Sequence, residues 1–387
     1  MSNFTASQEP CGFYEGYSLQ RFIIITACST VSLFGCLANL LLIAVFRRSL
    51  PSSIFLASLS VCDMLICLTY LLLFGVDAAI VYLKNTTLFF LYHTYIVPVF
   101  FIAKVVQFAI PFVLILITFE RYLWTCPEHK RQIFSPIFSE RGRNSAVFFL
   151  FFVSVALRVP VLFATKVEKF ENCPDYFRSE SVAPTEWAAN SEAYYIFDFH
   201  VITAIQMFFP FFVLLILNFT IIQRMIAEKR ENMYPLLPGQ HPPTDAKKVS
   251  FVQSNLPENY VLLQVAADVI KESLLHKSSR SKRNQLRNAI YTMIAIVSSY
   301  LICNGVHLFL TILERFDPSY LYESDDRAQS STFYIILSDT VSICYMISSA
   351  IRILIYTKCN SKLRKEIMEY CRGRSRGAAK IEINQNS

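Results

Sequence analysis

Residues 88–119 read LFFLYHTYIVPVFFIAKVVQFAIPFVLILITF, and this stretch decides the fold class. Lys104 is its only Lys, Arg, Asp or Glu residue, and the stretch exceeds the roughly 20 residues that a helix needs to cross a bilayer. Because backbone polar groups in lipid must be satisfied within the segment, a helix is favoured. The chain contains seven such apolar stretches, at 22–46, 54–76, 88–119, 146–164, 195–222, 287–313 and 331–356. The sequence therefore predicts an all-α membrane protein, a seven-transmembrane helix bundle.

The charged residues between the spans predict the orientation of the bundle. The net charges are +2, +2, +5 and +5 for the segments 47–53, 125–145, 223–288 and 357–387. They are −1, 0, −3 and −3 for the segments 1–21, 77–90, 165–194 and 314–330. Since Lys and Arg concentrate in cytoplasmic loops, the N-terminus is predicted outside and the C-terminus inside. Glycosylation sequons at Asn3 and Asn85 lie on the predicted outer side and agree with this orientation.

Three regions are expected along the chain. Residues 1–21 form an extracellular segment, 22–356 the membrane domain, and 357–387 a cytoplasmic amphipathic helix and tail. The internal loop 223–288 is polar and contains several prolines, which predicts a largely disordered linker. Apolar residues recur at helical spacing between 262 and 274, so a short amphipathic helix is expected within that loop.

The cysteines give a further prediction. Of the eleven cysteines, only Cys11 and Cys173 lie in segments predicted outside. An oxidising exterior favours a disulfide between them, and one or two free thiols are the alternative. Cys359 and Cys371 flank the amphipathic helix after the seventh span and are candidates for palmitoylation. The basic excess lies beside the inner leaflet, where it fixes topology and attracts anionic lipid, so nucleic acid is not an expected partner.

Ionisable residues at membrane depth are expensive and mark candidate functional sites. They include Asp63, Glu120, Arg121 and Arg352. The tripeptide Glu120-Arg121-Tyr122 closes the third span and resembles the Glu/Asp-Arg-Tyr motif of rhodopsin-like (class A) G-protein-coupled receptors. Other positions that match this family, in order along the seven spans, are Asn39, Asp63, Pro210 and Tyr356.

This resemblance implies a fold and an activity. A ligand that binds outside would shift a helix equilibrium, and the cytoplasmic face would open around Arg121 to admit a heterotrimeric G protein. The plasma membrane is the expected location of such a multi-pass protein. The residues expected to act in coupling and as the activation switch are Glu120, Arg121, Tyr122, Asn218 and Tyr356. Glu120 is expected to hold Arg121 in the inactive state.

A finer resemblance concerns the ligand. The fifth span from Pro210 through Ile221 and the sixth-span residues 300–304 are similar to invertebrate FMRFamide-like peptide receptors, and residues 120–124 resemble nematode ones. The acidic outer segments favour a basic ligand, such as an amidated neuropeptide that ends in Arg-Phe-amide. A small-molecule chemosensory receptor is the alternative.

The chain also departs from the family pattern. Ile96 stands where the third span usually carries a cysteine, Asn304 replaces the sixth-span tryptophan, and Asn218 replaces a fifth-span tyrosine. Arg352 stands where the seventh span usually carries an asparagine that helps Asp63 hold sodium. These changes leave a signalling-deficient receptor-like protein as a second alternative.

Arg352 suggests a specific arrangement in the middle of the membrane. Its helix normally faces Asp63 in this family, so a direct Asp63–Arg352 ion pair in place of sodium is our hypothesis, with Asn39 nearby. The alternative is that Arg352 extends to the cytoplasmic surface.

The ligand pocket is expected in the outer third of the bundle. Lys104 lies 17 residues before Arg121, which is about 25 Å along a helix. The candidate pocket residues are Asp77, Lys104, Gln107, His200, His307, Glu314 and Asp339.

Other function classes are poorly supported. The sequence has no glycine-rich phosphate loop, nucleophile elbow or metal-binding histidine spacing, so no enzyme, cofactor or metal is expected. It lacks the repeated halves and broken midplane helices expected of a transporter. A seven-helix channel stays possible, although it would not need Glu120-Arg121-Tyr122 at that position.

Overall fold

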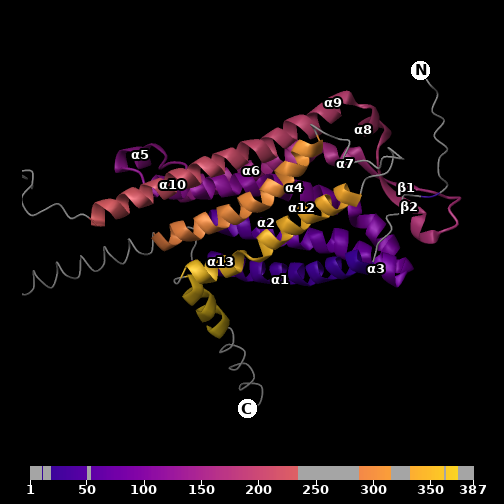
Figure 1. Ribbon diagram of the computed structural model, residues 1–387, viewed down its shortest axis with the longest axis horizontal. Coiled ribbons are helices and arrows are strands. Elements are labelled where there is room, and N and C mark those ends of the chain that lie inside the picture. Colours follow the sequence, from indigo (N-terminus) through magenta and orange to yellow (C-terminus); the bar gives the residue numbers. More distant parts are fainter. Residues whose placement is uncertain are drawn as a thin grey trace, which may run out of the picture.

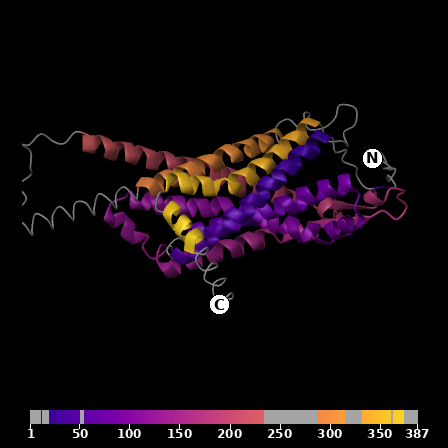
Figure 2. The same ribbon diagram turned by 90° about the horizontal axis from the view of Figure 1, so that it is seen from below.

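A computed structural model describes residues 11, 19–49, 54–233, 287–314, 332–360 and 363–373. Within them, seven helices are long and apolar enough to cross a membrane. They cover Leu19–Arg48, Ile54–Leu83, Thr86–Trp124, Glu140–Ala164, Glu192–Ala227, Arg287–Glu314 and Phe333–Cys359. Each overlaps one predicted span, and the helices lie side by side along the long axis of the molecule (Figures 1 and 2). The predicted seven-helix bundle is therefore confirmed, and its orientation stays a prediction.

The first three spans are built from four α-helices and one π-helical turn. Helix α1 covers Leu19–Ser49, and the second span joins α2 (Ile54–Tyr70), η1 (Leu71–Gly75) and α3 (Val76–Leu83). The third span is the single helix α4, Thr86–Trp124. The side-chain oxygen of Asn85 accepts a hydrogen bond from Leu88 N at 3.1 Å and so caps α4 at its N-terminus.

The fourth and fifth spans are separated by a short sheet. Their helices are α6 (Glu140–Arg158) and α7 (Pro160–Ala164), then α9 (Glu192–Tyr195), the π-helices η3 (Ile196–Ile202) and η4 (Ala204–Phe208), and α10 (Phe209–Met233). Between them, β1 (Thr165–Lys169) and β2 (Glu180–Pro184) pair antiparallel, with Thr165 opposite Pro184. The remaining short elements are α5 (Glu128–Ile133), η2 (Tyr176–Arg178) and α8 (Glu186–Asn190). The prediction of an all-α chain did not include this hairpin.

The last spans complete the bundle. The sixth is the helix Arg287–Glu314, and the seventh joins α12 (Thr332–Ala350) to α13 (Arg352–Cys359). Residues 363–373 form a further helix that turns away from α13 (Figure 1). Leu363 and Ile367 on it are buried against the main core, as the predicted amphipathic helix requires.

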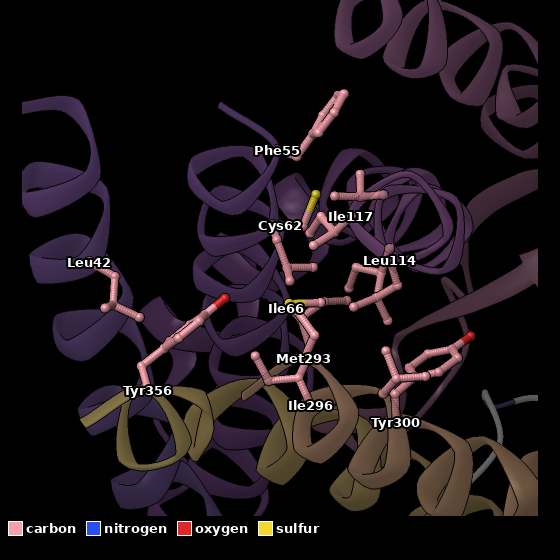
Figure 3. Close-up of a cluster of buried hydrophobic side chains, with 14 of the residues drawn as sticks. Leu42, Phe55, Cys62, Ile66, Leu114, Ile117, Met293, Ile296, Tyr300 and Tyr356 are labelled. Carbon is pink, nitrogen blue, oxygen red and sulfur yellow. The ribbon is translucent and has the colours of Figure 1, made fainter. Parts of the chain in front are cut away.

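One core runs between the helices, and the outward faces are apolar. In Figure 3, side chains from α2, α4 and the sixth span point toward one another, among them Ile66, Leu114, Ile117, Met293 and Ile296. Outward side chains such as Phe148, Phe219 and Ile302 are 74%, 61% and 73% exposed. An apolar outer surface of this kind fits a lipid environment and would be unusual for a protein in water.

The loop that carries the hairpin is tied to the N-terminal segment. Cys11 and Cys173 form a disulfide, with a Cα–Cα distance of 4.8 Å. The predicted pairing is therefore present, and the alternative of free thiols is wrong for these two residues. Cys359 is half-buried and Cys371 exposed, both as free thiols. Asn3 and the helix predicted within 262–274 lie outside the described residues.

Candidate functional site

The middle of the bundle contains a buried ion pair between the second and seventh spans. Arg352 Nη1 donates to both carboxylate oxygens of Asp63, at 2.7 and 2.6 Å. Both side chains are 1% exposed. The hypothesised ion pair is present, and the alternative in which Arg352 extends to the surface is wrong. Arg352 follows a local break in the seventh span, because α12 ends at Ala350 and α13 begins at Arg352.

Asn39 connects the first span to the same region. Its side-chain Nδ2 donates to the Gly35 carbonyl at 2.9 Å and to the Ser349 carbonyl at 3.2 Å. The Ser349 carbonyl belongs to α12, three residues before Arg352. The first, second and seventh spans are therefore joined by polar contacts at one depth.

At the inner end of α4, Glu120 has a partner that the sequence did not predict. Arg143 of α6 approaches it, with Nη1 at 3.3 Å from Oε1. The Arg121 guanidinium stacks on the Trp124 ring, 4.0 Å from its centroid. Glu120 also lies beside Arg121 in the helix, and the opposite charges of the two side chains attract each other. The role of Glu120 in holding Arg121 stays a prediction.

Tyr122 holds the fifth span at this end. Arg224 of α10 donates through Nη2 to the Tyr122 hydroxyl at 3.3 Å and through Nη1 to the Thr125 carbonyl at 3.3 Å. Its guanidinium also lies over the Tyr122 ring at 4.7 Å. Sequence reasoning missed Arg224, although it is the first basic residue after the predicted fifth span.

The other two switch candidates are buried polar groups. Asn218 is 6% exposed, and neither polar atom of its side chain has a hydrogen-bond partner among the described residues. Tyr356 is 2% exposed, and its hydroxyl likewise has none within that part of the chain. Buried groups of this kind are costly to leave unbonded. A rearrangement that gives either group a hydrogen-bond partner would therefore be favourable.

A cavity of about 710 Å³ opens at the end of the bundle that carries the hairpin. Asp77 and Asp339 supply carboxylates to its wall, and Phe100, Tyr92 and Tyr194 supply aromatic rings. Residues of β2 and the first residue of β1 complete the side nearest the sheet, where the hairpin lies at one end of the molecule (Figure 1). Its size lies in the range of small-ligand sites, roughly 300–1,000 Å³.

An ion pair crosses the wall of this cavity. Arg21 at the start of α1 approaches Asp339 of α12 through Nε and Nη2, with N–O distances of 2.9 and 3.1 Å. The side chains are 18% and 23% exposed, so the pair faces the opening. Tyr334, also in the wall, donates to Glu314 Oε1 at 3.2 Å. Glu314 therefore lies directly behind the lining.

The remaining pocket candidates lie elsewhere. The Lys104 amine lies 5.1 Å from the centroid of the Phe100 ring, beside the lining. His200 is exposed and packs on Tyr195 and Phe199, and it is not among the residues that line this cavity. His307 bonds through Nδ1 to the Tyr345 hydroxyl at 2.9 Å. Gln107 is half-buried. None of the predicted candidates except Asp77 and Asp339 lines this cavity.

The Asn304 substitution has a local consequence. The Tyr345 hydroxyl donates to Asn304 Oδ1 at 2.5 Å. Together with the His307 contact, this makes a polar chain between the sixth and seventh spans. It occupies the level where the family pattern places a tryptophan.

A further ion pair was missed from the sequence. Arg158 at the end of α6 approaches Asp198 of η3, with Nη1 at 2.9 Å from Oδ1, and also bonds to Gln206 of η4. The Arg158 side chain is only 7% exposed, whereas Asp198 is 39% exposed. Both residues lie inside predicted spans. The rule that ionisable residues at membrane depth mark candidate sites, which singled out Asp63, would therefore have found them. They join the fourth and fifth spans.

Comparison with known proteins assigns the family. Residues 38–356 match the family described as the 7 transmembrane receptor (rhodopsin family). This match covers most of the chain, and the chain belongs to that family of receptors. No curated protein matches the chain. In the described residues, no group of three or more His, Cys, Asp and Glu side chains could hold a metal ion.

Proposed function

We propose that this receptor acts at the plasma membrane, binds a cationic amidated peptide at the hairpin end and activates a heterotrimeric G protein at the Arg121 end. The hairpin end is then extracellular, in agreement with the charges of the loops. The observation that carries the ligand class is the cavity lined by Asp77 and Asp339, with Glu314 behind its wall.

The chemistry of this cavity fits an Arg-Phe-amide terminus. A guanidinium on the ligand would compete with Arg21 for the Asp339 carboxylate, because both groups form the same bidentate contact. The tyrosine and phenylalanine rings of the wall provide surfaces for an aromatic side chain and for cation–π contacts. Clefts with acidic walls also raise the local concentration of basic ligands.

Arg121 supports the coupling half of the proposal. Its side chain is 9% exposed and stacks on Trp124, while Arg143 pairs with Glu120. The guanidinium is therefore held between the Trp124 ring and the neighbouring Glu120 carboxylate, which it shares with Arg143. A signal would require the contacts of Tyr122 and Arg224 to change, because they tie the fifth span to the third.

One arrangement favours the alternative of a signalling-deficient receptor. The buried Asp63–Arg352 pair replaces the sodium site that the family resemblance implies, and Asn304 replaces the tryptophan of the sixth span. A fixed ion pair between two spans could hold a single packing of those helices.

G-protein activation in cells tests both readings. Cells expressing the chain would be exposed to a library of amidated peptides and to small cationic odorants, with surface expression confirmed. Activation by Arg-Phe-amide peptides that is lost in Arg121→Ala supports the proposal. Activation by small molecules alone would instead assign a chemosensory role, and silence toward both would assign a signalling-deficient one.

A further inference from the structure

A second cavity of about 360 Å³ lies at the Arg121 end of the bundle. It is enclosed by the inner end of α4, the segment that contains α5, and the beginning of α6. Its ionisable and aromatic lining residues are Glu120, Arg121, Trp124, Arg131, Phe134 and Arg143. The cavity shares Glu120 and Arg121 with the proposed coupling region, and its other walls come from the segment that contains α5 and from α6.

The lining is electropositive. Three guanidinium groups face one carboxylate, and that carboxylate, Glu120, is already paired with Arg143. Arg121 is nine-tenths buried, and its Nε has no hydrogen-bond partner within the described chain. Glu120 is shared between Arg121 and Arg143, and buried cations that outnumber the anions beside them are costly. An anion inside the cavity would relieve that cost.

The surroundings of the cavity are those of a membrane interface. Ile133 and Ile137, on the segment that forms one wall, are 63% and 46% exposed. Phe148 and Phe149 on α6 are 74% and 67% exposed and fit lipid contact. Exposed apolar side chains beside arginines are typical of segments that lie at the level of lipid headgroups.

We propose that this cavity binds the phosphomonoester headgroup of an anionic phospholipid from the inner leaflet. Arginine is suited to this chemistry, because its planar guanidinium bonds phosphate oxygens in pairs. The cavity volume falls within the roughly 300–1,000 Å³ of small-ligand sites. The proposal rests on the orientation proposed above, which places the Arg121 end inside.

Trp124 provides a reporter for this site, since it lines the cavity and Trp187 is the only other tryptophan. Full-length protein with Trp187→Phe would be purified in detergent and titrated with short-chain phosphatidylinositol bisphosphate, while Trp124 fluorescence is followed. A saturable change is expected. Soluble inositol trisphosphate in a parallel titration distinguishes a lipid from a free phosphate ester, and phosphatidylserine tests charge without a phosphomonoester.

A matched pair of variants makes the test specific. Arg131→Gln removes a lining guanidinium that pairs with the exposed Glu128, and Arg141→Gln removes an exposed guanidinium outside the lining. The dissociation constant should rise at least about fivefold for R131Q, the size of one basic contact at a membrane surface, and less than about twofold for R141Q. Equal effects of the two variants, or equal binding of phosphatidylserine, would overturn the proposal. No G protein enters this assay, so its failure leaves the proposed coupling untouched.

Discussion

Asp63 and Arg352 form an ion pair in the middle of the bundle, with N–O distances of 2.6 and 2.7 Å and both side chains 1% exposed. The pair joins α2 to the first residue of α13. Two charges at this depth are tolerated because each neutralises the other. The pair therefore constrains how the second and seventh spans pack.

The first prediction concerns removal of one partner. Asp63→Asn leaves the Arg352 cation buried without its carboxylate, which should lower stability by about 3–5 kcal/mol. Adding Arg352→Asn should recover part of that loss, because the double variant has no buried charge at this pair. Thermal unfolding of the purified protein measures both effects. A double variant less stable than either single variant would show that the contact does not hold the spans together.

The second prediction concerns sodium. Arg352 Nη1 contacts both oxygens of Asp63, so a sodium ion has neither the charge nor the ligands it needs there. Exchange of sodium for potassium chloride at constant ionic strength should leave the melting temperature unchanged within about 1 °C. Arg352→Asn should introduce sodium dependence. Sodium-dependent melting of the unaltered protein would contradict this interpretation.

The third prediction concerns the pair between the fourth and fifth spans. Asp198→Asn leaves Arg158, 7% exposed, with an unpaired charge, whereas Arg158→Gln leaves Asp198, 39% exposed, in contact with solvent. Asp198→Asn should therefore cost about 3 kcal/mol and Arg158→Gln about 1 kcal/mol. Chemical or thermal unfolding gives the order, and the reverse order would mean that Arg158 finds another anion.

The fourth prediction concerns the ion pair between Arg21 and Asp339 at the ligand cavity. If a cationic ligand competes with Arg21 for Asp339, Arg21→Gln should raise ligand affinity and Asp339→Asn should lower it, each by about tenfold. Competition binding on cells with matched surface expression measures both. Changes of the same sign in the two variants would place the cationic group of the ligand elsewhere.

The sequence alone predicted those features for which it left few possible arrangements. Apolar length gave the seven spans, and only two cysteines were available outside for the Cys11–Cys173 disulfide. Arg352 could be paired with Asp63 because the family resemblance implies that its helix faces Asp63, and a charge at that depth favours an opposite one.

Contacts that depend on which face of a helix a residue occupies were harder to predict from the sequence. The fifth span contains two π-helical segments, and their wider turns change which face each residue occupies. His200, in the first of these segments, is exposed and is not among the residues that line the cavity. The contact of Glu120 with Arg143 was also missed, because Arg143 comes from another helix, 23 residues further along.

The measurement that tests the central claim most directly is nucleotide exchange on a purified G protein by the reconstituted receptor. Arg-Phe-amide peptide should accelerate exchange for the unaltered chain and not for Arg121→Ala, while both bind the peptide at the hairpin end. Peptide binding without any acceleration by the unaltered chain, across the G-protein classes, would contradict the proposed coupling through Arg121.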